Sequence, residues 1–370
     1  MLRAHAGAVR PTLPWPQQRL LERLPSCRTP ALGGRLLECD HCGHEEVHYH
    51  PCQDRLCPTC AAARTARWVD ARQDKLLPVP HFQVVFTLPQ ELHGIARAAP
   101  AVVYGLLMSA AASTLQDALH TTYKARFAIT AVLHTWTREM LLHPHVHFIV
   151  SAGGLALDAS AWVATSESFL VSTQKLAPLF RGRMLSGLRL ARKSGELDLV
   201  DPLASRWESL LDAAFRKTWV VHVEAPEKRS PGTLLKYLAR YLFRVAIDDS
   251  RVLAHDGSTV TIRTRGNATA TMSGETFARR FAQHALPKGF RKVRHYGLSA
   301  PANINTRLPL AFELLGATPT PVRPTAPDPR LDPTEPPSVR CPRCRSTAVR
   351  LTELPPSRGP PTRSGGRSQP

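Results

Sequence analysis

The sequence predicts an α+β fold in which helices cover one face of an antiparallel sheet. Short apolar segments with the period-two alternation of strands are mixed with long stretches rich in Ala and Leu. These strands and helices follow one another without a regular strand–helix repeat, which a parallel sheet would require. An antiparallel sheet with helices on one side is therefore the expected architecture.

The individual elements are read from turn residues and from apolar periodicity. A strand is expected over residues 81–89, after a linker that contains Pro78 and Pro80, and one or two helices over residues 91–123. Asp256-Gly257 is a hairpin turn signal and predicts a hairpin over residues 251–265. Further strands are expected at 126–136, 144–152 (its hairpin partner) and 219–224, and helices at 176–192 and 203–218.

The most informative motif is the pair His145 and His147, separated by one apolar residue. In a strand, alternation places both imidazoles on one face while Val146 and Phe148 point to the other. Two histidines on an edge strand could simply be surface residues. This strand is otherwise apolar, however, and imidazoles without partners are costly in such surroundings. The pattern therefore favours a divalent-metal site with room for a third ligand and a substrate oxygen.

A second motif lies in a predicted helix over residues 230–245. Ser230 and Pro231 are favoured at a helix start, and Tyr237 and Tyr241, four residues apart, share one face. The leucines of this segment form an apolar stripe on another side. Tyrosines on amphipathic helices are often packing residues. Two phenols beside fixed cations would also suit attack on a phosphodiester, with the cations holding phosphate. These cations are Lys236, Arg240 and Arg244.

Cysteine spacing predicts structural zinc. The chain has eight cysteines, and in a reducing compartment they indicate metal rather than disulfides. Cys39-x-x-Cys42 and Cys57-x-x-Cys60 have zinc-ribbon spacing, so we expect these four thiolates to share one zinc. Cys27 and Cys52 are left over. They either help to bind a second zinc, with nearby histidines, or are buried small residues.

The C-terminal part is expected to be a basic, flexible tail. From Pro319 onward, 14 of the 33 prolines fall within 52 residues that contain few aromatics. Such a composition buries too little apolar surface to order itself. The tail contains a lone CxxC, Cys341 and Cys344, which is either half of a ribbon closed by another chain or a remnant.

Net charge predicts a polyanionic partner. Lys and Arg exceed Asp and Glu by 48 − 29 = 19. The alternatives are a merely soluble basic protein or a membrane-surface binder. The most apolar run, residues 101–115, is too short to span a membrane and is interrupted by Ser109 and Ser113. The N-terminus has no apolar signal core, so a cytoplasmic, nucleoid-associated protein that binds DNA and no membrane is expected.

Taken together, these motifs resemble the two-tyrosine HUH endonucleases, specifically the rolling-circle transposases of bacterial insertion sequences. The resemblance extends over most of the chain and rests on the order and spacing of short blocks. These blocks are residues 27–34, 84–89, 134–136, 143–147, 153–154, 179–182, 237–241, 244–247, 286–290 and 294–297.

The resemblance implies a fold and a domain organisation. The sheet would be the ferredoxin-like sheet of HUH endonucleases. Residues 1–75 would form a zinc-binding DNA-recognition module, residues 78–300 the catalytic transposase domain, and residues 301–370 the Pro-rich basic tail.

The resemblance also implies a mechanism. Mg²⁺ or Mn²⁺ held by His145 and His147 would polarise the scissile phosphate of single-stranded or melted DNA. Tyr237 or Tyr241 would attack, leaving a 5′-phosphotyrosine and a 3′-OH that can later rejoin strands. Related sequences commonly carry Gln two places after Trp136. This chain has Arg138 there, which cannot bind a metal, so Glu139 becomes the candidate third ligand.

Two other functions fit part of the pattern. A zinc-dependent DNA-binding regulator without catalysis accounts for the cysteines and the charge, but leaves the histidine pair and the tyrosines without a role. A metal phosphodiesterase that uses activated water accounts for the histidines, with the tyrosines only positioning the substrate. A covalent protein–DNA adduct would distinguish the transposase from both.

Overall fold

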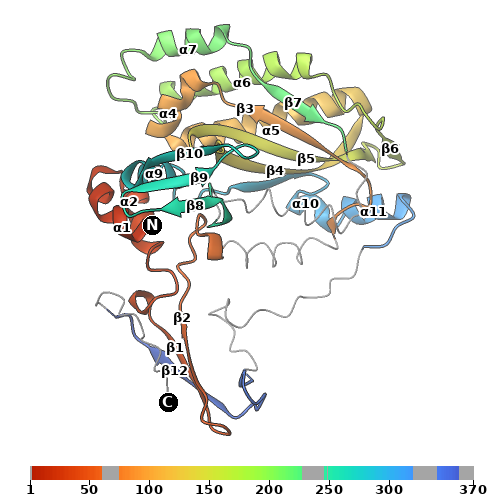
Figure 1. Ribbon diagram of the computed structural model, residues 1–370. Coiled ribbons are helices and arrows are strands. Elements are labelled where there is room, and N and C mark those ends of the chain that lie inside the picture. The colour runs from red at the N-terminus through yellow and green to blue at the C-terminus, as the bar shows by residue number, and fades with distance from the viewer. Residues whose placement is uncertain (1, 61–74, 227–245, 248, 320–339, 358–370) are drawn as a thin grey trace. The chain divides into compact units, whose positions relative to one another are not determined.

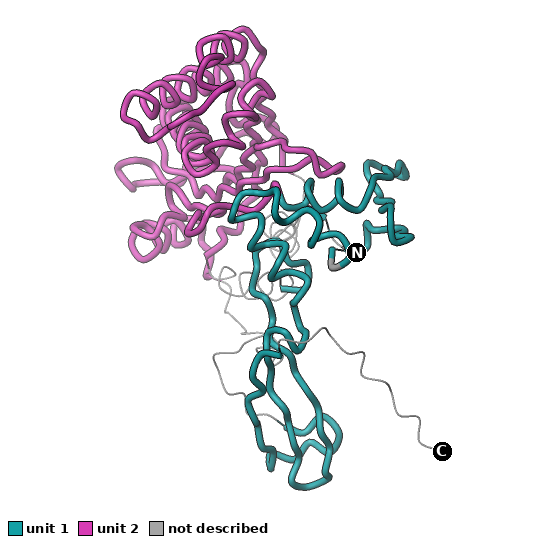
Figure 2. Tube along the Cα trace, turned by 90° about the vertical axis from the view of Figure 1, so that its left-hand side faces the viewer, with its two compact units in different colours: residues 1–66, 247–282, 324–370 teal, residues 67–246, 283–323 magenta. Residues whose placement is uncertain are grey.

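The computed structural model describes residues 2–60, 75–226, 246–247, 249–319 and 340–357. The chain divides into two compact units, coloured separately in Figure 2. Unit 1 comprises the described parts of residues 1–66, 247–282 and 324–370. Unit 2 comprises those of residues 67–246 and 283–323. Each unit is built around its own sheets and helices.

Unit 2 contains an antiparallel sheet whose strands run in the order β11-β4-β5-β3-β7, with β6 paired to β5. The two long strands β4 and β5 form a hairpin at its centre, as the sequence predicts. The strands are β3 (His81–Thr87), β4 (Ala125–Trp136), β5 (Leu142–Ala156), β6 (Trp162–Ala164), β7 (Val221–Glu224) and β11 (Val293–Gly297).

Helices cover one face of this sheet (Figure 1). The main apolar core lies between that face and the helices. Phe82, Phe86, Val146 and Phe148 point into that core and are fully buried. The covering elements are η4 (Gln90–Leu92), α4 (His93–Ala98), α5 (Pro100–Tyr123), α6 (Thr173–Lys193) and α7 (Trp207–Arg216). The α+β prediction, with an antiparallel sheet and helices on one face, is confirmed.

Helix α5 is long and apolar enough to cross a membrane by length and composition. Its side chains explain that composition differently, because Val103, Leu107 and Leu115 are fully buried against the sheet and α6. A central helix that is contacted on several sides needs apolar residues around much of its circumference. We therefore assign α5 to the protein core.

The end of unit 2 corrects part of the expected tail. α10 (Pro301–Ile304) and α11 (Arg307–Leu314) are helical, and Leu308, Ala311 and Phe312 are buried with Leu155 of β5. The apolar residues of α11 thus pack against the sheet. The helix lies beyond residue 300, where the catalytic domain was expected to end. The folded part of unit 2 extends through this helix.

Unit 1 joins two segments that are far apart in the sequence. Ala278 and Ala282 of α9 pack against Ala6, Val9 and Leu21 of the N-terminal helices. Residues 247–282 therefore belong to this compact unit of the structure. The elements are α1 (Leu2–Val9), η1 (Arg10–Thr12), α2 (Trp15–Arg23), η5 (Asp249–Arg251), α9 (Gly274–Ala282) and the sheet β8 (Val252–His255), β9 (Thr259–Arg263) and β10 (Thr269–Ser273).

The remainder of unit 1 is a three-stranded ribbon, defined here as β1 (Gly34–Cys39), β2 (Glu45–Tyr49) and β12 (Val349–Leu354). The short helix η2 (Pro30–Leu32) precedes it. The strand order is β12-β1-β2, with both pairings antiparallel. The segment around the third CxxC is thus folded onto the N-terminal hairpin, which corrects the expectation that the whole chain from Pro319 onward is a flexible tail.

Candidate metal centres

The sheet of unit 2 presents the predicted histidine pair as the alternation requires. Val146 and Phe148 of β5 are buried in the helical core, so the half-buried His145 and His147 lie on the opposite face. Their neighbours on β3 are Thr87, opposite His145, and Val85, opposite His147. The pair therefore stands on a central strand with paired strands on both sides.

A third histidine, which the sequence reasoning did not assign as a ligand, completes the group. His134 of β4 is the direct cross-strand partner of His145. One ring nitrogen from each of His134, His145 and His147 lies within 4.8 Å of the others. The ring centroids are 5.4 Å apart for His134 and His145, 4.6 Å for His134 and His147, and 4.9 Å for His145 and His147. We call these residues the histidine triad.

Glu139, the expected third ligand, is not part of this group. It lies exposed in the turn between β4 and β5, where its backbone N–H donates to Thr137 Oγ1. The signal that could have identified His134 is the hairpin itself. An antiparallel hairpin with its turn at residues 137–141 places 134 opposite 145, on the same face of the sheet.

Hydrogen bonds orient two of the three imidazoles. Nδ1 of His145 is 2.6 Å from the backbone oxygen of His143, and a carbonyl oxygen can only accept, so Nδ1 carries the hydrogen. Nε2 of His145 is then the ligand atom. The side-chain amide of Gln83 on β3 lies 3.2 Å from Nδ1 of His147. The atom of Gln83 in this contact is the amide nitrogen Nε2, which donates to Nδ1 and holds the His147 ring in place.

His134 is fixed by packing. It is only 3% exposed, and its ring stacks on Trp136 with centroids 5.0 Å apart and the planes 24° apart. The ammonium of Lys292 lies over the indole ring of Trp136, 5.0 Å from its centroid. A stacked, buried imidazole has little rotational freedom. His134 is therefore held at the triad before any ligand binds.

The β4–β5 turn is held by a buried histidine. Nε2 of His284 lies 3.1 Å from the backbone oxygen of Met140, and its Nδ1 lies 3.1 Å from Oγ1 of Thr135. Gln283 also donates to the Met140 oxygen, at 2.8 Å. Burial lowers the pKa of His284 to about 4, so the ring is neutral at neutral pH. These contacts fix the hairpin next to His134.

The predicted tyrosine helix cannot be compared with the structure. Tyr237 and Tyr241, together with Lys236, Arg240 and Arg244, lie outside the described residues. The roles expected for them stay predictions.

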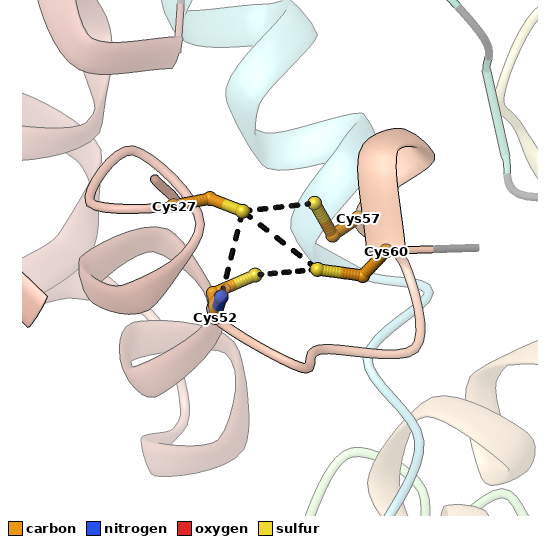
Figure 3. Close-up of side chains that lie close together, drawn as sticks. All are labelled: Cys27, Cys52, Cys57 and Cys60. Atoms are coloured by element: carbon orange, nitrogen blue, oxygen red, sulfur yellow. Dashed lines mark hydrogen bonds between the residues drawn. The ribbon is translucent and has the colours of Figure 1, made fainter. Parts of the chain in front are cut away.

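In unit 1, four cysteines meet at the base of the ribbon (Figure 3). The sulfur of Cys27 lies 3.7 Å from that of Cys60 and 3.6 Å from that of Cys57, and Cys52 lies 3.8 Å from Cys60. Four sulfurs arranged tetrahedrally around zinc lie about 3.8 Å apart, given Zn–S bonds of about 2.3 Å. We call this group the first sulfur cluster.

Within the first sulfur cluster, hydrogen bonds among the thiols lower the pKa of Cys27 and Cys60 and raise the pKa of Cys52 and Cys57. Hydrogen bonds from the thiols of Cys52 and Cys57 lower the pKa of Cys27 to about 7. The neighbouring thiols, that of Cys27 foremost, lower the pKa of Cys60 as well. Thiolate is the form that binds metal. The backbone N–H of Cys52 donates to the sulfur of Cys27 at 3.4 Å, which adds a fixed donor.

The expected pairing of Cys39 and Cys42 with Cys57 and Cys60 was wrong. Cys39 ends β1 at the tip of the ribbon, whereas the Cys57-x-x-Cys60 segment follows the ribbon at its base. Strands of five or six residues separate the two ends by roughly 17 Å. Cys27 and Cys52, which the spacing left over, are the true partners of Cys57 and Cys60.

At the ribbon tip, Cys39 and Cys42 meet the third CxxC. The sulfur of Cys39 lies 3.6 Å from that of Cys344, and the sulfur of Cys42 lies 3.6 Å from that of Cys341. We call this group the second sulfur cluster. The lone CxxC is thus closed by its own chain, and not by a second one.

Comparisons with known proteins identify two families along the chain. A family described as "Putative transposase" matches residues 128–307, and a family described as "Transposase zinc-binding domain" matches residues 2–88. The chain is 36% identical over 330 residues to "Putative transposase y4qJ" of Sinorhizobium fredii (strain NBRC 101917 / NGR234), which covers 84% of this chain and 81% of that protein.

A second relative is the "Transposase for insertion sequence element IS801" of Pseudomonas savastanoi pv. phaseolicola. It is 30% identical over 311 residues, which cover 80% of this chain and 73% of the relative. No solved structure matches the chain.

A histidine-bearing sheet and a cysteine-rich N-terminal module, with these matches, define an insertion-sequence transposase that acts on DNA. The chain belongs to the IS91 family of transposases. The zinc-binding family match and the sulfur clusters support structural zinc in this chain.

Proposed function

We propose that this transposase nicks and rejoins single-stranded DNA at transposon ends through a 5′-phosphotyrosine intermediate, as rolling-circle transposition requires. The observation that carries the proposal is the histidine triad. Three imidazoles converge on one point from two central strands, and the hydrogen bond from Nδ1 of His145 leaves its Nε2 as the ligand atom. A purely DNA-binding regulator gives such a group no role.

The donor set fits a divalent metal. Three ring nitrogens within 4.8 Å of one another leave further coordination positions for water or a phosphate oxygen. Mg²⁺ prefers oxygen ligands, so of the two expected metals Mn²⁺ suits three imidazoles better. His134 then takes the third position that Glu139 was expected to fill. Bound there, the metal would withdraw charge from a non-bridging oxygen of the scissile phosphate.

The chemistry at phosphorus is assigned to the tyrosines. The phenol oxygen of Tyr237 or Tyr241 forms a bond to phosphorus while the bond from phosphorus to the 3′ oxygen breaks. The phenol loses its proton and the departing 3′ oxygen gains one. One phosphodiester replaces another, so a later 3′-OH can reverse the step and join strands without ATP. Two tyrosines allow one to hold an end while the other cuts.

Binding of the strand is assigned to cations. Lys236, Arg240 and Arg244 flank the two tyrosines in the predicted helix and would contact the phosphates on either side of the cleaved bond. A net charge of +19 supports affinity for DNA along the rest of the chain. The substrate is single-stranded or melted, because the attacking oxygen must reach the phosphate in line. This function places the protein in the cytoplasm, at the nucleoid.

Zinc has a separate, structural role in this proposal. The first sulfur cluster, Cys27, Cys52, Cys57 and Cys60, lies within the matched zinc-binding domain and has the sulfur spacing of a tetrahedral site. Tetrahedral thiolate sites without an open position stabilise small modules, and do not catalyse reactions. We assign this module to recognition of the transposon end.

The test is cleavage of an end-spanning single-stranded oligonucleotide with Mn²⁺, compared with the same sequence as a duplex. We expect cleavage of the single strand by the wild type, with none in EDTA and none by His145→Ala or His147→Ala. Binding of the oligonucleotide should change little in these variants, because phosphate contacts dominate affinity. Full cleavage in EDTA, or parallel loss of binding and cleavage, would contradict the proposal.

A metal phosphodiesterase that uses water would also depend on the histidine triad. The two mechanisms differ in their products. Hydrolysis releases a free 5′ or 3′ phosphate and leaves protein and DNA separate, whereas tyrosine attack leaves a denaturation-resistant adduct. The same reaction, analysed by denaturing electrophoresis with labelled oligonucleotide, separates them.

A further inference from the structure

Two CxxC segments about 300 residues apart in the sequence fold into matching turns. In the first, the N–H of Cys39 donates to the oxygen of His44 and the N–H of Gly43 donates to the oxygen of Cys39, both at 2.9 Å. In the second, the N–H of Cys341 donates to the oxygen of Ser346 at 2.8 Å and the N–H of Arg345 donates to the oxygen of Cys341 at 2.9 Å. The pattern of donors and acceptors is the same in both turns.

The backbone after the second cysteine also matches. Gly43 has φ of 69° and Arg345 has φ of 65°, so both turns close through the left-handed region. Arginine rarely adopts that conformation, which costs a non-glycine residue free energy. The matching turns place both sulfurs of each CxxC on one side, as the knuckles of a zinc ribbon do.

Strand pairing brings the two turns together. β12 runs antiparallel to β1, with Gly34 opposite Leu354 and Cys39 opposite Val349. The N–H of Asp40 then donates to the oxygen of Ala348 at 2.9 Å, which continues the pairing into the turns. The turns consequently face each other at the tip of the ribbon, and each sulfur of one CxxC has a partner in the other.

The sulfur geometry fits a tetrahedral metal. The two cross-pairs, Cys39 with Cys344 and Cys42 with Cys341, are both 3.6 Å apart, close to the spacing of about 3.8 Å in a zinc–thiolate tetrahedron. A disulfide would bring two sulfurs to about 2.05 Å, and all four cysteines are free. Cys39 and Cys341 are buried, which shields the centre from solvent.

Among the described residues, the C-terminal strand is held by its backbone pairing to β1 and by contacts at the surface. No residue of β12 is buried, and its side-chain contacts to the hairpin include two ion pairs at the surface, Arg35 with Glu353 and Arg350 with Asp40. Exposed ion pairs contribute little stability. A metal bound by both turns would add a stronger link between this strand and the hairpin.

We propose that Cys39, Cys42, Cys341 and Cys344 bind a second structural zinc, which fastens the C-terminal segment to the N-terminal hairpin. The matched zinc-binding domain ends at residue 88, so half of this site lies outside it. Residues 340–354 are then an integral part of the ribbon. This segment carries four exposed arginines, whose charge offsets the two net negative charges of a zinc bound by four thiolates. They are Arg340, Arg343, Arg345 and Arg350.

The first test counts zinc in the full-length protein by elemental analysis. We expect two zinc ions per chain in the wild type and one in the double variant Cys341→Ser/Cys344→Ser. Arg343→Ser, which introduces the same residue between the two ligands, is the matched control and should keep two. One zinc in the wild type, or two in the double variant, would overturn the proposal.

A second measurement needs only the wild type, so it decides the question even if the double variant does not fold. Cysteine alkylation followed by peptide mass spectrometry should show Cys341 and Cys344 protected in the zinc-loaded protein and modified after chelation. Cys39 and Cys42 should lose protection together with them. Alkylation of Cys341 and Cys344 at the same rate with and without zinc would contradict the site.

Discussion

His134 of β4 lies directly opposite His145 of β5, and their ring centroids are 5.4 Å apart on the face of the sheet opposite the main apolar core. This cross-strand pair turns a His-x-His strand into a three-imidazole group. The third ligand comes from a neighbouring central strand, and its position is set by hairpin register.

His134→Ala should therefore weaken the metal site without unfolding the sheet. Removing one of three protein ligands should lower Mn²⁺ affinity by at least about 100-fold, the upper range for loss of an outer-shell partner. Cleavage at limiting Mn²⁺ should fall accordingly. Isothermal titration and a Mn²⁺ titration of cleavage measure both effects.

The matched control is His222→Ala, on β7 of the same sheet and exposed. His222 is outside the group of close ring nitrogens, so its loss should leave Mn²⁺ affinity within about twofold, since surface substitutions usually change little. Equal losses in the two variants would remove the case for His134 as a ligand. Glu139→Ala should behave like the control.

Gln83 is predicted to position His147. Gln83→Leu removes the amide that contacts Nδ1 of His147 at 3.2 Å and keeps a side chain of similar size. Loss of such an orienting partner should lower Mn²⁺ affinity by about 10- to 100-fold. Saturating Mn²⁺ should restore most of the cleavage rate, because the ligand itself is still present. A variant with wild-type Mn²⁺ affinity would show that this contact orients nothing.

His81 predicts a pH dependence of stability. Burial lowers the pKa of His81 to about 4 from an ordinary value of 6.5, and its Nδ1 has no hydrogen-bond partner among the described residues. The unfolded chain therefore binds a proton at higher pH than the folded chain does. Stability is fully present above pH 6.5 and falls as the pH drops from 6.5 to 4.

The size of this effect follows from the shift. Each pH unit below 6.5 should cost up to about 1.4 kcal/mol, or up to about 3 kcal/mol in total at pH 4. His81→Gln removes the titrating group, so its urea unfolding curve, followed by tryptophan fluorescence, should depend less on pH in this range. An unchanged pH dependence in the variant would contradict the assignment of this effect to the lowered pKa of His81.

Loss of a first-cluster ligand should unfold the base of the ribbon. Cys27→Ser removes a residue whose sulfur lies within 3.7 Å of two others, and zinc binding supplies much of the folding free energy of such modules. We expect one fewer zinc per chain and faster amide exchange over residues 27–60. The neighbouring Ser26→Ala should change neither. Retained zinc and unchanged exchange in Cys27→Ser would contradict the assignment.

The sequence predicts those features that depend on local pattern. Alternation along residues 144–152 places His145 and His147 on one face because side chains in a strand have a period of two. Helix and strand positions in unit 2 agree with their predicted ranges within a few residues, because long amphipathic segments carry a strong periodic signal. The α+β class follows from their order.

Features that depend on distant contacts could not be read in this way. CxxC spacing identifies metal-binding pairs, but it does not say which pairs meet. Cys39 and Cys42 join cysteines about 300 residues away, because β12 returns to β1. Likewise, α11 looks like part of a Pro-rich tail until Leu155 of the sheet supplies a partner for Phe312. Assigning His134 as a ligand requires the exact register of the β4–β5 hairpin, whereas the sequence predicts only that the two strands pair.

The most direct test of the central claim is identification of the residue that becomes linked to DNA. The full-length protein is incubated with Mn²⁺ and an end-spanning single-stranded oligonucleotide, and the adduct is digested and sequenced by mass spectrometry. We predict a 5′-phosphodiester on Tyr237 or Tyr241. Each Tyr→Phe variant should form adduct at the other tyrosine, and the double variant, still folded and still binding DNA, should form none. Attachment at any other residue, or wild-type cleavage by the double variant, would contradict the account.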